Sequence, residues 1–218
     1  MSVGIFGGTF NPVHFGHLRA AEEVREKLNL EKILFIPSGT PPLKTEGIAA
    51  ARHRLEMLRI ALRGNPFFDL SDIECRRRGK SFTVRTLETL RTLYPEMRFY
   101  FILGIDAFLD IPNWWQPDLL VAMTDFAVIS RPGFSFRSMR ESPYVRGGAR
   151  IPKDIDESND EVNVIRLRSG RSALLLRMTP LGISSTSVRR SIEQGKSIKY
   201  LLPPGVQSYI ITHKLYKS

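Results

Sequence analysis

The chain of 218 residues lacks several features that mark particular classes of protein. It has a single cysteine, Cys75, so it cannot form an internal disulfide, and its four histidines show no structural-zinc spacing. No apolar run approaches the roughly 20 residues that a membrane helix needs. The apolar run at residues 3–6 is too short for the core of a signal peptide. We therefore expect a cytoplasmic protein without a membrane segment.

Acidic residues are scarce relative to basic ones: 22 Asp and Glu face 32 Lys and Arg, for a net charge of +10. Such a balance suits nucleic acid, a membrane surface or small polyanions such as nucleoside triphosphates, and charge alone leaves all three open. The densest basic run, residues 76–78, has no interleaved aromatics. We interpret it as a solvated face beside a strand, which leaves nucleic-acid binding a secondary hypothesis.

Apolar runs of strand length alternate with helical periodicity along the chain. Strands are expected at residues 3–6, 32–36, 99–103, 126–129 and 174–178, and helices at residues 16–28, 52–62, 82–93, 187–193 and 205–215. This alternation predicts an α/β fold, a Rossmann-like doubly wound parallel sheet in a single domain over residues 1–218 with a C-terminal helical segment. Such sheets bind ligands beyond the carboxyl ends of their strands.

The segment from residue 132 to 170 breaks this pattern. It has no clear periodicity and is rich in Gly, Pro, Ser, Arg and Asp. A loop of this length in a compact domain is usually either functional or disordered. We predict a mobile loop at residues 133–170 and assign no site to it.

The motif GGTFNPVHFGH at residues 7–17 lies between the first expected strand and the first expected helix. Gly7 and Gly8 allow the backbone to approach a phosphate closely, and Pro12 fixes the turn. The start of the helix offers unpaired N–H groups and the positive end of its dipole. The position of the motif therefore favours anion binding.

Two histidines stand in this motif, His14 and His17, three residues apart at the start of the helix. Both can point to one side, and each ring can donate a hydrogen bond to a phosphate oxygen. A lone histidine there would usually be a packed or capping residue, but a pair around Gly16 favours anion binding. A zinc site is the other alternative. With only His53 and His213 remaining and no nearby carboxylate cluster, we expect no metal ligands in the protein.

A second motif, ISSTSVR at residues 183–189, stands at the start of another expected helix. Hydroxyl and N–H groups at a helix N-terminus form an anion site, and Arg189 can hold a phosphate with its two-pronged guanidinium. Taken alone, the string would be an ordinary Ser/Thr helix cap. Its occurrence downstream of the first motif favours a second contribution to the same anion site.

Together the two strings resemble the HxGH and ISSTxxR signatures of the nucleotidyltransferase superfamily, whose HxGH histidines bind ATP phosphates. The resemblance implies catalytic roles for His14, His17 and Arg189. Asn11 stands where Asp is more common, and Asn suits the same local hydrogen bonds. The resemblance also implies an ATP-binding set made of Gly7, Gly8, Thr9, Phe10, Ile183, Ser184, Ser185 and Thr186.

The segment PSGTPPLK at residues 37–44 resembles the superfamily stretch that carries a lysine over the triphosphate, which implies a catalytic role for Lys44. Leu43 stands where His is common in relatives, so any role of that His is absent or moved. Without the resemblance, Lys44 would be interpreted as a solvated surface lysine.

Three further pieces resemble the nicotinate-mononucleotide adenylyltransferase branch: SFTVRTL at 81–87, LGIDA at 103–107 and PNWW at 112–115. The resemblance implies that Trp114 stacks on the pyridine ring and Asp106 contacts ribose. It also implies that N–H groups near Thr83, Val84 and Trp115 meet the pyridine carboxylate. Without it, Trp114 would be a core aromatic and Asp106 a helix cap.

The implied reaction joins ATP and nicotinate mononucleotide to give nicotinate adenine dinucleotide and pyrophosphate, with Mg²⁺ on the triphosphate and no protein nucleophile. The expected partners are these small molecules, not nucleic acid or a membrane, and the oligomeric state stays open. One alternative is another acceptor, nicotinamide mononucleotide or phosphopantetheine. The other is a basic nucleic-acid-binding domain, which would leave both phosphate motifs unexplained.

Overall fold

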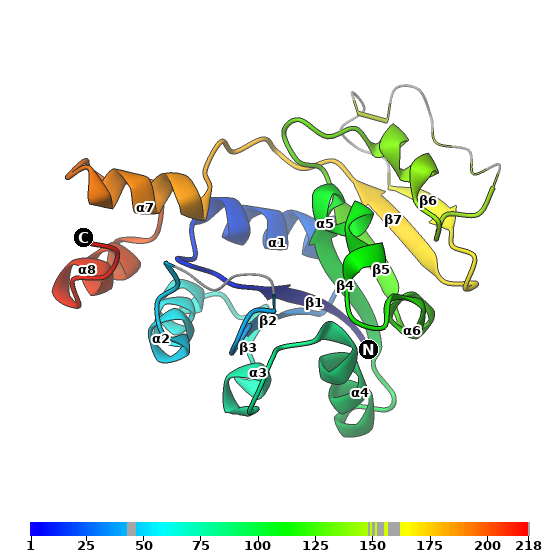
Figure 1. Cartoon of the computed structure of the whole chain (residues 1–218), viewed down its shortest axis with the longest axis horizontal. Helices are drawn as coiled ribbons and strands as arrows, with labels where there is room; N and C mark the ends of the chain where they lie inside the picture. Colours follow the sequence, from blue (N-terminus) through cyan, green and yellow to red (C-terminus); the bar gives the residue numbers. More distant parts are fainter. Residues whose placement is uncertain (43–46, 148, 150, 152–154, 157–161, 218) are drawn as a thin grey trace.

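The computed structural model describes residues 1–42, 47–147, 149, 151, 155–156 and 162–217. Within these ranges seven strands form one sheet in the order β3-β2-β1-β4-β5-β7-β6, parallel throughout except for the β6–β7 pair (Figure 1). The strands are β1 (Ser2–Gly8), β2 (Lys32–Pro37), β3 (Phe68–Leu70), β4 (Arg98–Gly104), β5 (Asp125–Ile129), β6 (Asn163–Arg166) and β7 (Ser172–Leu176). The predicted Rossmann-like α/β sheet is confirmed.

Helices cover both faces of the sheet, as a parallel sheet requires. They are α1 (Phe15–Lys27), α2 (Ala51–Leu62), α3 (Ile73–Arg76), α4 (Thr83–Leu93), α5 (Ile105–Leu109), α6 (Pro117–Met123), α7 (Ser185–Glu193) and α8 (Pro204–Thr212), with 3₁₀ turns η1 (Ile111–Asn113) and η2 (Phe136–Glu141). One apolar core joins the sheet to α4, α5 and α6, and the other joins it to α1, α2, α7 and α8. None of the described helices is long and apolar enough to cross a membrane.

The chain reverses its direction across the sheet between β1 and β4. The first strands run outward from β1 to β2 and β3, and the later parallel strands run the other way from β4 to β5 and β7. The neighbouring strands β1 and β4 therefore form the topological switch point, where open α/β sheets bind their ligands. Their carboxyl ends are Gly8 and Gly104.

The predicted loop at residues 133–170 is partly wrong. The structure places η2 in it, and also β6, which pairs antiparallel with β7 through Ile165 and Ala173. Sequence periodicity missed β6 because it is a short edge strand in which only one of four residues is buried. Residues 148, 150, 152–154 and 157–161 lie outside the described part of the chain. The mobility of the segment stays a prediction.

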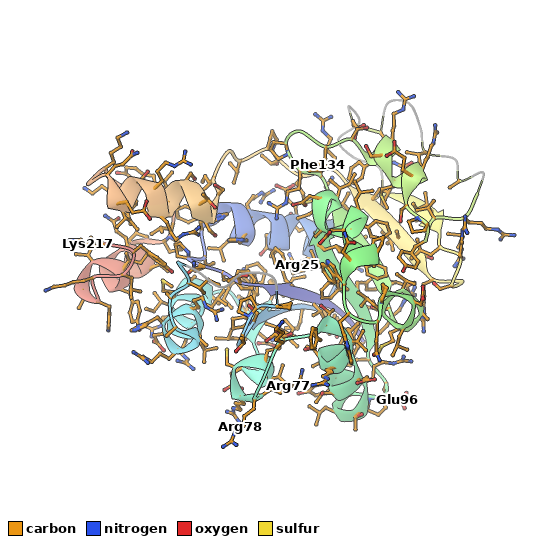
Figure 2. The ribbon with its side chains drawn as sticks, in the orientation of Figure 1. Arg25, Arg77, Arg78, Glu96, Phe134 and Lys217 are labelled. Atoms are coloured by element: carbon orange, nitrogen blue, oxygen red, sulfur yellow. The ribbon has the colours of Figure 1, made fainter. Side chains whose placement is uncertain are left out.

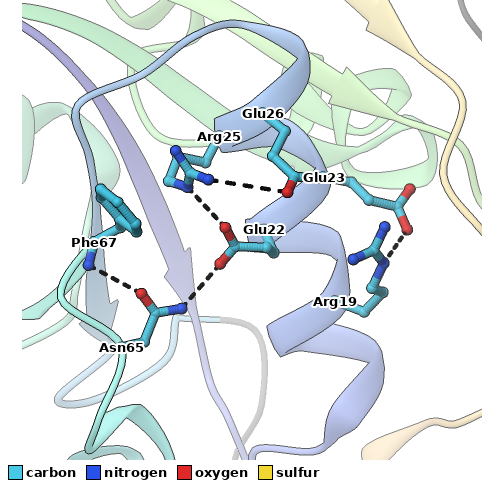
Figure 3. A network of polar contacts seen from close by, with 7 residues as sticks. All are labelled: Arg19, Glu22, Glu23, Arg25, Glu26, Asn65 and Phe67. Atoms are coloured by element: carbon cyan, nitrogen blue, oxygen red, sulfur yellow. Dashed lines mark hydrogen bonds and ion pairs between the residues drawn. The ribbon is translucent and has the colours of Figure 1, made fainter.

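Polar contacts tie α1 to its surroundings (Figure 3). Glu22 accepts hydrogen bonds from Arg25 at 2.8 Å and from the side chain of Asn65 at 2.9 Å, just before β3. Glu23 pairs with Arg19 and also accepts from the Thr179 N–H at 2.9 Å, beyond β7. The helix that begins at the GGTFNPVHFGH motif is thus tied to both halves of the sheet.

The basic run at residues 76–78 is solvated only in part. Arg76 and Arg78 are exposed, and Figure 2 shows Arg78 pointing away from the ribbon beyond α3. Arg77 instead turns toward α4, where it donates hydrogen bonds to Thr86 at 3.3 Å and Thr89 at 3.2 Å. One arginine of the three therefore ties α3 to α4.

Candidate active site

The turn after β1 carries the first motif, and its backbone faces a pocket while its largest side chain faces the core. Phe10 has a left-handed backbone, with φ of 48°, and its ring is buried. That ring packs edge-on against the His17 ring, with centroids 5.1 Å apart. The turn packs closely, since a Cβ at Gly8 would lie 3.2 Å from the Phe10 ring. Any contact of Phe10 with ATP must therefore come from its backbone.

The two motif histidines stack on each other, with ring centroids 3.7 Å apart and planes 29° apart. His14 is the N-cap of α1, and its backbone N–H donates to Nδ1 of His17 at 3.3 Å. Because Nδ1 of His17 accepts this bond, a neutral His17 ring carries its proton on Nε2. His17 can thus donate a hydrogen bond through Nε2.

His14 is buried, unlike His17, and is only 3% exposed. Burial, together with the positive charge of Arg131, lowers its pKa to about 4, so the ring is neutral at pH 7. Its Nδ1 is buried and makes no hydrogen bond within the described residues. His14 therefore supports the His17 ring by stacking and capping, and adds no positive charge of its own.

The second motif lies directly against the first. Ser184 caps α7, and the hydroxyl of Ser185 donates to the Pro12 carbonyl at 2.9 Å. The Arg189 guanidinium donates to the carbonyl of Asn11 at 2.8 Å. The close approach of the two motifs depends on Gly16, because a Cβ at this position would lie only 3.3 Å from the Ile183 carbonyl oxygen. The structure thus brings the first turns of α1 and α7 together, as the sequence predicted.

Arg54 also holds this turn, although sequence analysis missed it. Its side chain, 1% exposed, donates to the carbonyls of Ala49 at 2.9 Å, Thr9 at 2.8 Å and Gly39 at 2.9 Å. Burial lowers the pKa of the guanidinium. Arg54 lies one turn before Met57 and Leu58 on the buried face of α2. A charged residue on an apolar helix face was the signal that could have found it.

A pocket of about 490 Å³ opens beside the turn at the carboxyl ends of the strands. Its lining includes Gly7, Gly8 and Thr9 of the first motif, and a set with three aromatic rings that we call the aromatic end: Phe82, Thr83, Asn113, Trp114 and Trp115. The pocket therefore has the turn of the first motif and a group of aromatic rings in one lining.

The aromatic end is built from α4 and the segment after η1. The Trp115 ring stacks on Phe82, with centroids 4.8 Å apart, and the Arg85 guanidinium lies 5.1 Å from the Trp115 ring. Trp114 is fixed differently, since its indole N–H donates to Asp110 at 3.1 Å and its ring meets Phe101 edge-on. Both tryptophans line the pocket.

Three predicted site residues do not have side chains in the described lining of the pocket. The Val84 side chain is buried in the core, so only its backbone N–H, in the first turn of α4, can serve the site. Asp106 lies in the first turn of α5, just after β4 and outside the lining of this pocket, with a carboxylate oxygen 3.7 Å from Nε of Arg131. Lys44 lies outside the described residues.

Two buried polar groups line the pocket that sequence analysis did not name. The hydroxyl of Ser38, directly after β2, has no hydrogen-bond partner within the described residues. Glu74 accepts from the Thr86 hydroxyl at 2.7 Å, and burial raises its pKa. Ser38 follows a strand at the ligand-binding edge, which was a usable signal. Glu74, on the short helix α3, had no sequence signal that would have marked it as a pocket residue.

Solved structures share this fold. A nicotinic acid mononucleotide adenylyltransferase of Plasmodium falciparum, complexed with NaAD, matches with a TM-score of 0.75 and 23% identity, covering 99% of this chain and 97% of that one. The same protein complexed with APC matches with a TM-score of 0.73 and 22% identity. At this identity the likeness shows the fold alone.

Sequence comparison shows the family. The cytidylyltransferase-like family model matches residues 5–191. A protein of Syntrophotalea carbinolica is 43% identical, over 100% of this chain and 98% of its own, and one of Geotalea daltonii is 40% identical, over 99% and 98%. Both are named "probable nicotinate-nucleotide adenylyltransferase". The chain therefore belongs to the cytidylyltransferase-like family and, within it, to the nicotinate-nucleotide adenylyltransferases.

Proposed function

We propose that the chain transfers the AMP unit of ATP to nicotinate mononucleotide, giving nicotinate adenine dinucleotide and pyrophosphate. The pocket carries this proposal, because the turn after β1, which we call the phosphate-binding turn, and the aromatic end both line one space of about 490 Å³. A pyridine mononucleotide has a flat ring at one end and a phosphate at the other. The family membership of the whole chain supports the same acceptor.

In this proposal ATP lies along the paired starts of α1 and α7. An oxygen of the mononucleotide phosphate attacks the α-phosphorus in line, the bond to the bridging oxygen breaks, and pyrophosphate leaves with the bonding electrons. His17 donates through Nε2, Arg189 adds positive charge, and the helix N-termini supply N–H groups. We also propose that Lys44, which follows β2 in the sequence, adds a further positive charge. Catalysis is then positioning and charge stabilisation, without a protein nucleophile.

The acceptor lies with its ring toward Trp114 and its carboxylate toward the first turn of α4. The N–H groups of Thr83 and Val84 stand in that turn and, with the Trp115 N–H, donate to the carboxylate. Asp106 contacts a ribose hydroxyl from the first turn of α5. The buried hydroxyl of Ser38 gains a partner when a polar group of the ligand fills the pocket.

Nucleotidyltransferases of this kind generally use a divalent metal with ATP. We propose Mg²⁺, bound by the triphosphate oxygens, because it prefers hard oxygen ligands and keeps part of its water shell. We also propose the cytoplasm as the place of the reaction, since ATP is a substrate.

The test compares nicotinate mononucleotide, nicotinamide mononucleotide and phosphopantetheine at saturating ATP and fixed salt, following pyrophosphate. A carboxylate accepts from two converging N–H groups, whereas a carboxamide turns an NH₂ toward one of them. We expect kcat/KM for the acid to exceed that for the amide, by up to roughly 10⁴-fold where the mismatch is fully buried. Equal values, or a preference for the amide, would overturn the acid assignment while leaving the adenylyltransferase assignment standing. Pyrophosphate release with phosphopantetheine alone would contradict both pyridine acceptors.

A further inference from the structure

The C-terminal segment, which lies outside both signature motifs, contacts the phosphate-binding turn. The hydroxyl of Tyr216 donates to the side-chain oxygen of Asn11 at 2.7 Å. Burial raises the pKa of this hydroxyl, so it stays protonated and remains a donor at neutral pH. Lys217, labelled in Figure 2, marks the end of the described chain beside α8.

Asn11 is a junction between several segments. Its side-chain oxygen also accepts from the N–H of Ala49 at 3.0 Å, and its amide group donates to the carbonyl of Gly47 at 2.9 Å. Its own carbonyl accepts from Arg189. Residue 11 thus joins the turn to residues 47–49, to α7 and to the tail. An Asp at this position could accept the same bonds, but it could not donate to Gly47.

The backbone after α8 is shaped for this contact. Lys214 and Tyr216 have left-handed backbones, with φ of 50° and 62°. Residues other than glycine rarely adopt this conformation, and do so where the surrounding structure holds the backbone in place. Helix α8 itself is seated on α2, where a Cβ at Gly205 would lie 2.7 Å from the Ile60 side chain. In Figure 1 the C-terminus lies beside α8.

We propose that Tyr216 is a positioning residue for the transfer reaction, acting through the Asn11 side chain on the phosphate-binding turn. Arg54 and Arg189 bond to backbone carbonyls of the turn, whereas Tyr216 fixes the orientation of the Asn11 amide. A loosened turn moves the N–H groups that face the triphosphate, and small displacements of such groups are costly in rate. The aromatic end of the pocket takes none of its residues from this segment. This inference rests on the proposed function for its kinetic readout.

The chain offers a matched control in Tyr209. Its hydroxyl makes a 3.0 Å hydrogen bond with His53, between α8 and α2, and does not touch the turn. Tyr209→Phe therefore removes one tyrosine hydrogen bond from the same part of the molecule. If Tyr216 merely held the C-terminal segment in place, the two variants would behave alike.

The experiment measures kcat and KM for both substrates in Tyr216→Phe and Tyr209→Phe, together with binding of a non-hydrolysable ATP analogue. For Tyr216→Phe we expect a loss of about fivefold in kcat/KM for ATP and a similar weakening of analogue binding, with KM for the acceptor within about twofold. Tyr209→Phe should match the wild type in all of these. Wild-type values in Tyr216→Phe, or equal losses in both variants, would refute the positioning role.

Analogue binding separates this inference from the proposed function. If the wild type binds the analogue yet releases no pyrophosphate with nicotinate mononucleotide, the proposed reaction fails. The comparison of analogue binding between Tyr216→Phe and Tyr209→Phe still decides the role of Tyr216.

Discussion

The two ends of the pocket are built in different ways. At the phosphate-binding turn, hydrogen bonds from Arg54, Ser185, Arg189 and Tyr216 converge from distant parts of the chain. At the aromatic end, the rings of Phe82, just before α4, and Trp115, after η1, stack on one another, and Trp115 is 37% exposed. Directional bonds fix donors in place, whereas stacked rings tolerate small shifts. We therefore expect the first end to control the rate and the second to control which acceptor binds.

The largest effect should come from the phosphate-binding end. His17→Ala removes the Nε2 donor but leaves the apolar face of α1 intact, so the fold should survive. By analogy with losing one oxyanion donor, kcat should fall roughly 10²–10³-fold. The measurement is steady-state pyrophosphate release, with circular dichroism to confirm folding and His213→Ala, an exposed histidine, as the control. Near-normal turnover in folded His17→Ala would remove His17 from the chemistry.

The same end should also respond to acid through His14. Above pH 6.5 its ring is neutral in the folded and unfolded chains alike; between 6.5 and about 4 only the unfolded chain gains the proton. The free energy of unfolding should therefore fall with pH across this window, by up to about 3 kcal/mol from this residue. Urea titrations from pH 7 to 4 test it. In His14→Gln this part of the slope should vanish, and an unchanged slope would contradict the assignment.

A smaller effect is expected at the aromatic end. Trp114→Leu keeps an apolar side chain but loses the flat ring, and stacked rings contribute about 1 kcal/mol. KM for nicotinate mononucleotide should rise about tenfold or less, while KM for ATP stays near its wild-type value. Steady-state kinetics with each substrate varied in turn checks this. If KM for ATP rose equally, the two ends would not be separable in function.

The smallest effect is expected at Cys75, which is not among the residues that line the pocket. Its thiol is half-buried against the Pro37 carbonyl, and burial raises its pKa, which disfavours the reactive thiolate. Cys75→Ser should keep kcat within about twofold of the wild type. Loss of turnover in a folded Cys75→Ser protein would reveal a thiol role that the geometry does not suggest.

The two ends also differ in how well the sequence predicted them. The turn could be predicted because its glycines, histidines and helix start are consecutive, so local chemistry determines their arrangement. The partners of Arg54 and Tyr216 could not, because they are backbone carbonyls and an amide that only the folded sheet brings near. At the aromatic end, the sequence motifs predicted both tryptophans as site residues, but not the Trp115–Phe82 stack or the Trp114–Asp110 hydrogen bond.

The strands of the sheet also differ in how well the sequence predicted them. The central strands were predicted because burial on both faces gives them continuous apolar runs. The edges were missed: β3 has three residues, and β6 has a single buried position. Edge strands form where a neighbouring strand offers hydrogen bonds, and that neighbour is not visible in their own residues.

The contact between Asn11 and Tyr216 spans 205 residues of chain. This separation determines when the contact can form as the chain is synthesised. Residue 11 leaves the ribosome early, whereas its partner leaves after both signature motifs and every strand of the sheet. Contacts of such sequence separation also form late in folding, because a long loop must close first. A product truncated before α8 would keep both motifs yet lack the bond that orients Asn11. Counting intact motifs in a gene fragment therefore overestimates the activity it can encode.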